Sequence, residues 1–400
     1  MMNLNVKLND GTIGLMKIAI VAGGTGGHIY PALTLAEELE KRGNEIVFFG
    51  SIDRMEKDVV PKAGFKFIGL DITSTSGNIF NKVLSVFSMN KAYRKCLKLL
   101  KGFDMAIGFG NYISVPVILA AKKLGLKTVI HEQNSFVGKA NKMLDTNVDL
   151  VIGSYLEDKN QFKNPNTFIL GNPQSGKAFN YKKDDNYLSE LGLDKNKKTV
   201  VIFMGSLGSE TITKVMIDFF KLLDGKYQVI YATGSAYYED VVSKTEKKDY
   251  LVIKERIDGI KAMKASDLLV SRAGATTLCE ITALGMPAIL IPSPYVPNNH
   301  QYFNALALVE NDAALMIEEK DLSAISLKEK IDSIINDVDT LNSLANNAKS
   351  MANSTVIEDI VEKIEKLWLK NFYVNAEIIA MIKLLVSLLP LRWVERLLIM

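Results

Sequence analysis

Cysteine is scarce in this sequence, which contains only Cys96 and Cys279 in 400 residues. The two lie far apart, so the sequence predicts neither a disulfide framework nor a cysteine metal site, and this usage is typical of a reducing compartment. Residues 1–15 contain no continuous apolar run and no small-residue cleavage site. We therefore expect no signal peptide there, and we place this leader outside the predicted fold.

A charge excess of either sign is also missing, because 48 Lys and Arg are balanced by 45 Asp and Glu to a net charge of +3. No overall electrostatic field therefore indicates a nucleic-acid partner. Apolar residues make up 48% and charged residues 23% of the chain, as in globular proteins with a real core. A chain of this length is expected to form two domains.

Metal-binding and dinucleotide patterns are missing as well. There is no His-x-x-x-His, and the chain has three histidines in all, His28, His131 and His300. We therefore expect no required metal and no cofactor. The glycines at 23–27 do not have the spacing Gly-x-Gly-x-x-Gly, and no acidic residue ends the next predicted strand, which disfavours a nicotinamide dehydrogenase.

Short apolar runs alternate with helix-length stretches, which predicts parallel sheets covered by helices. The first series has predicted strands at 17–22, 45–50, 66–70, 104–108, 127–131 and 149–153, and predicted helices at 30–42, 54–63, 79–101, 114–124 and 137–145. The second has predicted strands near 199–204, 227–232, 250–253, 267–271 and 287–292. The fold class is therefore α/β, with two doubly wound, Rossmann-like domains facing a central cleft.

The predicted domains are 16–172 and 173–353, separated by Gly171-Asn172-Pro173 and the polar stretch that follows. A helix pattern at 354–370 is expected to pack back on the first domain. Residues 371–400 form a more apolar extension, which is not a clean membrane span. It suits either a membrane interface or a helix packed on the protein.

The first predicted strand leads into Gly23-Gly24-Thr25-Gly26-Gly27-His28. Glycines let the backbone approach a ligand closely, and the N–H groups of the following helix favour phosphate or developing negative charge. A helix N-terminus lowers a histidine pKa, so a neutral His28 would accept a proton from a hydroxyl nucleophile. His28 is our candidate general base, although a lone histidine is more often structural.

Other polar clusters lie at corresponding strand ends. His131-Glu132-Gln133-Asn134 follows one apolar strand, and a binding role is favoured over an ordinary capped loop because burial without a ligand is costly. Gly274, Ala275 and Thr276 form a second phosphate-type corner. Glu280 shares a helix face with Thr276 and would accept ribose hydroxyls. Gln301 and Asn304, three residues apart on a helix opening at His300, would suit sugar hydroxyls.

The stretch 79–101 combines apolar and basic residues, which suits an anionic membrane surface. The alternative is a core-packed helix with a solvated basic face. The apolar residues assigned to this membrane patch are Ile79, Phe80, Leu84 and Phe87.

Taken together, these motifs and their order resemble the MurG family of peptidoglycan glycosyltransferases over roughly residues 16–370. They are Gly23 to His28, Gly108 to Tyr112, His131 to Asn134, Gly171 to Pro173, Gly205 to Gly208, Ser271 to Glu280 and His300 to Asn304. The resemblance implies a GT-B fold and inverting, metal-independent transfer of N-acetylglucosamine. The donor would be UDP-N-acetylglucosamine, and the acceptor undecaprenyl-pyrophosphoryl-N-acetylmuramyl-pentapeptide, so that lipid I becomes lipid II in peptidoglycan synthesis.

The resemblance also implies roles for individual residues. Glu280 would bind the donor ribose, Ile257 would contact the uracil, and the membrane patch would lie on the cytoplasmic face of the bacterial plasma membrane. The donor-binding residues that it implies are Thr25, Gly26, Gly27, Asn134, Ser206, Ile257, Glu280 and Gln301, to which the motifs above add Gly274, Ala275, Thr276 and Asn304. The implied acceptor-side residues are Gly23, Gly24, Tyr112, His131 and Glu132.

Some positions depart from the family pattern. Ser175 stands where the family usually has arginine, and Lys177 is the cation nearest in sequence that would replace it, without bidentate geometry. Asn111 replaces a common glycine, and Met204 stands where the second domain's turn usually has another glycine. Two alternatives remain open: a diacylglycerol glycosyltransferase, which would share the fold and the membrane surface, and a non-enzymatic protein that binds nucleotide sugars or lipids, which Ser175 and Met204 motivate.

Overall fold

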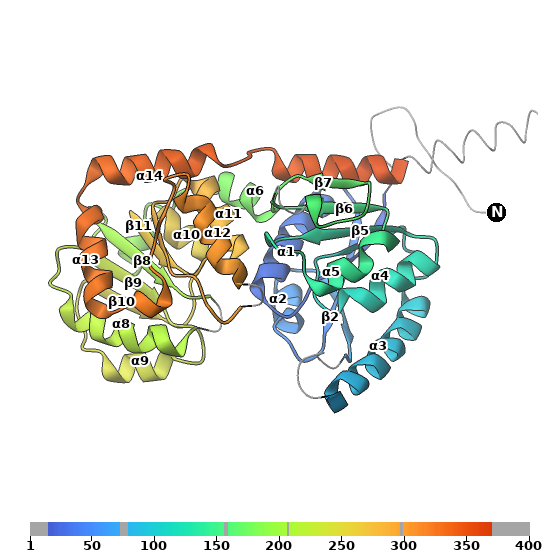
Figure 1. The fold of residues 1–400 in the computed structure, drawn as a ribbon, viewed down its shortest axis with the longest axis horizontal. Coiled ribbons are helices and arrows are strands. Elements are labelled where there is room, and N and C mark those ends of the chain that lie inside the picture. Colours follow the sequence, from blue (N-terminus) through green and yellow to red (C-terminus); the bar gives the residue numbers. More distant parts are fainter. Residues whose placement is uncertain (1–14, 73–78, 156–158, 206–207, 297–298, 370–400) are drawn as a thin grey trace, which may run out of the picture.

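The computed structural model describes residues 15–72, 79–155, 159–205, 208–296 and 299–369, with the backbone alone at 79–84. The predicted leader, except Leu15, and the extension 371–400 therefore lie outside the described residues. The described chain forms two α/β domains that lie side by side (Figure 1). Within the described ranges, no helix is long and apolar enough to cross a membrane.

The first domain is built on a parallel sheet, which has seven strands in the described residues, in the order β3-β2-β1-β4-β5-β6-β7. The strands are β1 (Lys17–Val21), β2 (Glu45–Ser51), β3 (Lys66–Leu70), β4 (Met105–Gly108), β5 (Lys127–Glu132), β6 (Leu150–Gly153) and β7 (Thr167–Ile169). The helices between them are α1 (Gly26–Lys41), α2 (Glu56–Lys62), α3 (Ile79–Leu99), α4 (Ser114–Lys123) and α5 (Lys139–Leu144). The strand order reverses between β1 and β4, where such sheets bind ligands.

The second domain repeats this plan, with six parallel strands in its described part, in the order β10-β9-β8-β11-β12-β13. They are β8 (Thr199–Phe203), β9 (Gln228–Ala232), β10 (Leu251–Lys254), β11 (Leu268–Ser271), β12 (Ala288–Leu290) and β13 (Leu315–Met316). Its helices are α6 (Gln174–Phe179), α7 (Tyr187–Glu190), α8 (Glu210–Leu222), α9 (Tyr238–Lys244), α10 (Gly259–Lys264), α11 (Ala275–Leu284), α12 (His300–Val309), α13 (Ala324–Ile335) and α14 (Val338–Ser350). The order reverses between β8 and β11.

Every predicted strand is present, and most bounds agree within one residue. The short edge strands β7 and β13 were not predicted, because two or three residues give no measurable alternation. The prediction for the first helix was wrong at its start: α1 begins at Gly26, not at 30. Glycine disfavours helix, but packing of Ile29 and the residues after it overrides that propensity, so His28 lies in the first turn.

Residues 356–369 form a further helix, which lies on the first domain although it follows α14 of the second. Figure 1 shows the two helices in succession along one long side of the molecule. The buried side chains Val356, Ile357, Ile360, Val361 and Ile364 belong to the same core as Ile18 and Ile20 of β1. Arg42, at the end of α1, also lies 3.3 Å from a carboxylate oxygen of Glu365. The chain therefore crosses between the domains a second time.

Replacing Ile360 with alanine should destabilise the first domain, because this side chain is fully buried in the core beneath the 356–369 helix. We expect a loss of about 2–5 kcal/mol in the free energy of unfolding, measured by urea denaturation. The matched control is Lys366→Ala on the exposed face of the same helix, which should change stability by less than about 0.5 kcal/mol. Equal effects of the two substitutions would contradict this packing.

Candidate active site

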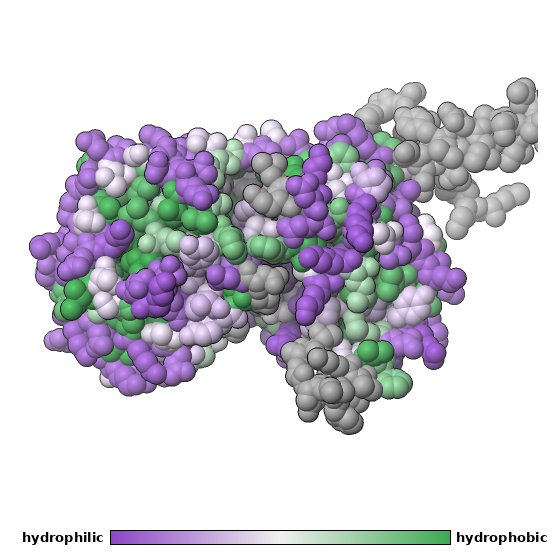
Figure 2. All heavy atoms as spheres, viewed as in Figure 1, coloured by the Kyte–Doolittle hydropathy of each residue, from purple (hydrophilic) through white to green (hydrophobic). Residues whose placement is uncertain are grey.

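The loops at the carboxyl ends of the two sheets meet between the domains. Thr276 Oγ1 at the start of α11 donates a hydrogen bond to the Gly27 carbonyl in the first turn of α1, at 3.3 Å. Phe136 of the first domain packs on Phe303 of α12, with ring centroids 5.6 Å apart. On the side opposite the 356–369 helix, the space-filling view shows a notch between the two domains (Figure 2). The two predicted phosphate-type corners thus face one cleft.

Glu56, the first residue of α2, packs against the glycine loop after β1 and hydrogen-bonds to its backbone. This fully buried carboxylate accepts hydrogen bonds from Gly24 N at 3.2 Å and from Ser51 N at 2.9 Å. A Cβ at Gly23 would come within 2.5 Å of Glu56 Oε1, so a side chain there has no room. Glu56 has no distinctive sequence signal, because an acidic residue in the first turn of a helix is common and only its burial marks it.

Asn111 holds the same loop from the other side. Its backbone is left-handed, with φ of 65°, a conformation that asparagine tolerates better than most residues. Asparagine can therefore occupy a position that would otherwise favour glycine. Its side-chain Nδ2 donates to the Gly23 carbonyl at 2.9 Å, and its Oδ1 accepts from Tyr112 N at 2.6 Å. Because Asn111 packs this closely, a Cβ at Gly24 would approach its Nδ2 within 2.2 Å.

His28 is half-buried at the cleft, with its Nδ1 3.0 Å from Thr25 Oγ1. Removal from solvent lowers the pKa of His28, and the nearby Glu132 carboxylate opposes this shift. In the tautomer with the proton on Nδ1, that nitrogen donates to Thr25 and Nε2 keeps a free lone pair. The Nε2 edge lies beside Gly110, where a Cβ would come within 3.6 Å of it. This is an arrangement suited to a general base.

His131, which is predicted to lie on the acceptor side, has partners at both ring nitrogens. It is buried, its Nε2 lies 3.0 Å from the Gly171 carbonyl, and its Nδ1 lies 3.0 Å from Gln133 Nε2. The ring stacks on Phe109 with centroids 5.2 Å apart, and burial lowers the pKa of His131 to about 4. It is therefore a neutral structural side chain that joins the end of β5 to the segment between the domains.

Glu132 likewise shapes its own loop. It is buried, and its two carboxylate oxygens accept hydrogen bonds from the backbone N–H groups of Gln133, Asn134 and Gly138 and from the side chains of Asn134 and Asn141. Its predicted place on the acceptor side stays a prediction. Its effect on the cleft is indirect, because it positions the half-buried Asn134 and lies near His28.

Tyr112 is half-buried beside the glycine loop. Burial raises the pKa of Tyr112, and the neighbouring Arg54 opposes this shift, so the phenol stays protonated near neutral pH. Its position, one residue after Asn111, keeps it on the first-domain side of the cleft.

In the second domain, Gly274 caps α11, which leaves the first N–H groups of that helix directed toward the cleft. Arg272, just before this corner, is buried and links it to the turn between β8 and α8. Its guanidinium bonds the Ser209 hydroxyl at 3.0 Å and pairs with Glu319 at 2.6 Å. Ser206 lies outside the described residues, so its predicted role stays a prediction.

Glu280 lies one turn after Thr276 on α11 and is almost completely buried. Its Oε1 accepts a hydrogen bond from Gln174 Nε2 at 2.8 Å. Burial raises the pKa of Glu280 to about 7, whereas the bond from Gln174 favours the ionised form. The position suits a carboxylate that binds hydroxyl groups. The Glu280 carboxyl group ionises, and so becomes a stronger hydrogen-bond acceptor, as the pH rises through 7.

The other predicted donor residues differ in their surroundings. Gln301 Oε1 accepts from Ser293 N at 2.9 Å, and Ile257 is a partly buried residue next to the α10 cap, Asp258. Lys177 is half-exposed and lies 3.7 Å from Glu37 of α1, so it contacts the other domain.

Asn304, which is predicted to contact the donor sugar, makes two hydrogen bonds within the protein. It is fully buried, its Oδ1 accepts from the Ser135 hydroxyl at 2.7 Å, and its Nδ2 donates to the Ala273 carbonyl at 3.2 Å. Both ends of its amide are engaged within the protein. Asn304 therefore links the domains beneath the cleft, which a helix-face argument could not show.

The predicted membrane patch is described in part. Phe87 on α3 is 70% exposed and its neighbour Val86 is 65% exposed. Ile79, Phe80 and Leu84 lie on the same helix, but their side chains are outside the described residues. Ala92 and Cys96 are buried against the domain, so α3 has an inward face and an outward face. Exposed cations follow along the helix at Lys91, Arg94, Lys95 and Lys98.

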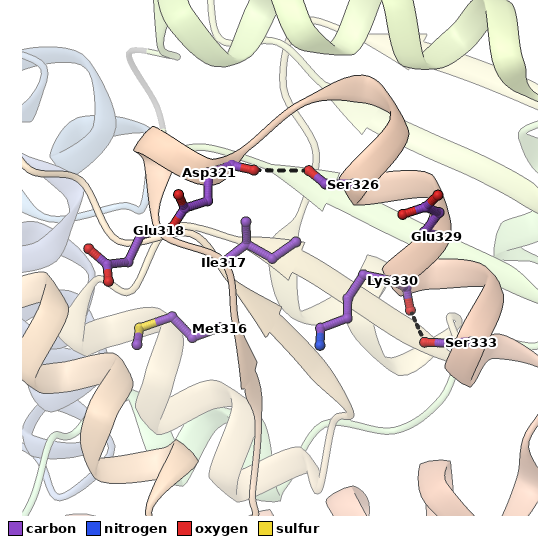
Figure 3. A pocket seen from close by; sticks show the side chains of 8 residues that line it. All are labelled: Met316, Ile317, Glu318, Asp321, Ser326, Glu329, Lys330 and Ser333. Carbon is purple, nitrogen blue, oxygen red and sulfur yellow. Dashed lines mark hydrogen bonds between the residues drawn. The ribbon is translucent and has the colours of Figure 1, made fainter.

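A hollow of about 510 Å³ lies elsewhere on the second domain, between β13 and α13. Figure 3 shows Met316, Glu318, Lys330 and other side chains at its rim. Ser326 and Ser333 donate to backbone carbonyls at 3.1 and 2.8 Å, so these polar groups are already engaged. None of the predicted site residues lines this hollow.

Two substitutions at Asn111 should separate its backbone strain from its hydrogen bonds. Asn111→Ala and Asn111→Gly both lose the bond to Gly23, at about 1 kcal/mol each. Only alanine must also adopt a positive φ, which adds about 1 kcal/mol of destabilisation. Urea denaturation should therefore rank wild type above Asn111→Gly above Asn111→Ala. If alanine and glycine were equally stable, the left-handed conformation would not be what limits this position.

Two family models match the chain: Glycosyltransferase family 28 N-terminal domain over residues 18–152 and Glycosyltransferase family 28 C-terminal domain over residues 199–364. Curated relatives include the UDP-N-acetylglucosamine--N-acetylmuramyl-(pentapeptide) pyrophosphoryl-undecaprenol N-acetylglucosamine transferase of Bacillus subtilis (strain 168). It is 39% identical, over 84% of this chain and 95% of the relative. The protein of the same name from Halothermothrix orenii is 36% identical, over 88% of this chain and 98% of the relative.

Solved structures with the same architecture include MurG of Acinetobacter baumannii. It is 24% identical with a TM-score of 0.68, covering 88% of this chain and all of that one. A UDP-N-acetylglucosamine 2-epimerase is also similar, at 15% identity and a TM-score of 0.62, covering 88% of this chain and 96% of that one. The two facing Rossmann-like domains and these neighbours confirm the predicted GT-B fold.

Proposed function

The chain belongs to glycosyltransferase family 28, and we propose that it transfers N-acetylglucosamine from UDP-N-acetylglucosamine to undecaprenyl-pyrophosphoryl-N-acetylmuramyl-pentapeptide. This step converts lipid I to lipid II in peptidoglycan synthesis. The observation that carries the proposal is the meeting of the two ligand-binding corners at Gly27 and Thr276, beside a neutral His28, in a chain this similar to transferases of that name.

The second domain holds the donor in this proposal. The N-terminus of α11, with Gly274, Ala275 and Thr276, binds the diphosphate through backbone N–H groups. Glu280 accepts hydrogen bonds from the ribose, and Ile257 contacts the uracil. Gln301, Ser206 and, from the first domain, Thr25, Gly26, Gly27 and Asn134 complete the donor site.

The first domain presents the acceptor to the donor. Gly23, Gly24 and Tyr112 form its side of the cleft, and His28 Nε2 accepts the proton of the muramyl 4-hydroxyl. The hydroxyl oxygen then bonds to the anomeric carbon as the bond from that carbon to the UDP oxygen breaks, which inverts the configuration. The electron pair leaves with UDP, whose charge is stabilised by the α11 N-terminus.

We also propose that α3 binds the cytoplasmic face of the plasma membrane, where the lipid-linked acceptor lies. Phe87 and Val86 are exposed next to a row of cations, a combination that binds anionic lipid surfaces. The helix runs along the side of the first domain opposite the 356–369 helix (Figure 1). The protein would then be a peripheral membrane enzyme.

The purified protein should transfer labelled N-acetylglucosamine to lipid I, and His28→Ala should reduce turnover by about 10²–10⁴-fold because the general base is lost. Mass spectrometry of the lipid product identifies the acceptor, and UDP affinity by calorimetry is the control, expected to be unchanged. Transfer to diacylglycerol in place of lipid I would identify the related lipid glycosyltransferase. UDP binding without acceptor-dependent release of UDP from the donor would identify a non-enzymatic binding protein. Wild-type turnover of His28→Ala at saturating acceptor would refute the assigned base.

Binding to vesicles that contain anionic lipid tests the membrane surface. Replacing Val86 and Phe87 together with serine should weaken binding roughly tenfold, because two exposed apolar side chains leave the interface. Ile325→Ser is the matched control, since Ile325 is 63% exposed but lies on α13 of the other domain. Vesicle flotation should show weakened binding for the α3 variant alone, and an equal loss in both would argue against this surface.

A further inference from the structure

We propose that Gln174 is a positioning residue for the donor: its side-chain amide holds the Glu280 carboxylate in the orientation that binds ribose and fixes it against α1 of the first domain. The inference rests on the proposed function, because it takes Glu280 as the ribose-binding group. Gln174 is the first residue of α6, immediately after the segment that joins the domains. No sequence motif singled it out.

The geometry of Gln174 is that of a two-sided bridge. Its Oε1 accepts from the Thr34 hydroxyl of α1 at 2.7 Å, and its Nε2 donates to Glu280 Oε1 of α11 at 2.8 Å. All three side chains are buried. A flipped amide would direct its oxygen at the carboxylate and its NH₂ away from it, so the partners fix one orientation.

Glu280 depends on this bridge more than Glu56 or Glu132 depends on any one partner, because each of those carboxylates accepts hydrogen bonds from two or more groups. In the described part of the chain, the amide of Gln174 is the one group that donates a hydrogen bond to it. Its second oxygen, Oε2, accepts none within those residues, which leaves it available to a ligand hydroxyl. A ribose has two neighbouring hydroxyl groups that can donate hydrogen bonds. A carboxylate that is restrained at one oxygen can accept them without first losing rotational freedom.

The charges around Glu280 set the direction of its response to losing Gln174. Asp258, at the start of α10, disfavours the ionised carboxylate, and Lys177 on α6 favours it. The neighbouring thiol of Cys279 has a raised pKa because of burial and stays neutral. Without the amide, burial and Asp258 are opposed only by a half-exposed lysine that also lies near Glu37. The carboxyl group should then be protonated over a wider pH range and be a poorer acceptor.

The link to Thr34 gives the bridge a second consequence. Thr34 and His28 lie on the same helix, α1, so the carboxylate at one end of the donor and the candidate base share a rigid support. Lys177 and Glu37 make a parallel contact between α6 and α1 at 3.7 Å. Through α6, the position of Glu280 is set relative to α1 as well as to its own domain.

The test compares Gln174→Met with Thr34→Val in the full-length protein, using UDP as the probe in calorimetry between pH 6 and pH 9. For Gln174→Met we expect the Kd for UDP to rise about tenfold at pH 7, since a hydrogen bond to a charged group is lost. The difference in Kd between Gln174→Met and wild type should shrink toward pH 9. The pH at the midpoint of the change in Kd should be higher for the variant than for wild type. The KM for the donor should rise similarly, with kcat at saturating donor within about twofold of wild type.

Thr34→Val keeps the bond from the amide to the carboxylate, so its Kd should change less than about threefold with an unmoved midpoint. A merely structural role for Gln174 would change Kd equally at every pH, and that result, or an unchanged Kd, would overturn the inference. If Gln174→Met does not fold by circular dichroism, Gln174→Glu applies the same test, since a second carboxylate also raises the Glu280 pKa. A wild-type protein that binds no UDP would refute the proposed function itself, whereas normal binding and transfer with an unaffected Gln174 variant refutes only this assignment.

Discussion

The loop after β1 has no room for side chains, and the arrangement of the cleft depends on that restriction. Glu56 lies against Gly23 and Asn111 against Gly24, each close enough to exclude even a Cβ. Their hydrogen bonds to the loop fix its backbone, and the fixed loop in turn sets where α1 begins and where His28 projects. A carbonyl of the same loop then receives Thr276 from the other domain, so one tightly packed turn positions groups on both sides of the cleft.

Three buried carboxylates around the cleft, Glu56, Glu132 and Glu280, differ in how many hydrogen-bond donors contact them. A carboxylate with many donors stabilises the protein's own loops, whereas one with few donors can still bind a ligand. Glu132 is enclosed by its own loop, and Glu56 is shared by two backbone N–H groups. Glu280 has one amide donor in the described residues. Since a buried charge needs partners, a carboxylate with few of them is a natural place for hydroxyl groups to bind.

Much of this could be predicted from the sequence, because most strands are apolar runs and the glycine corners directly follow β1, β8 and β11. What the sequence could not show depends on contacts between distant residues. His131 reads as a ligand-facing polar residue until Phe109 and Gly171 are seen to enclose it. Asn304 reads as a cleft residue until Ser135 is found opposite it. Gln174 carries no signal, since both of its side-chain partners are more than 100 positions away.

The helix at 356–369 joins the core of the first domain after the chain has already completed the second. The two domains are therefore connected by two covalent strands of chain, one entering α6 and one leaving α14, and both lie toward the same long side of the molecule (Figure 1). Because both covalent connections lie on that side, the rest of the boundary between the domains is held by non-covalent contacts alone, such as those of Thr276 with Gly27 and of Phe136 with Phe303. Any separation of the domains would break those contacts and leave the chain connections intact.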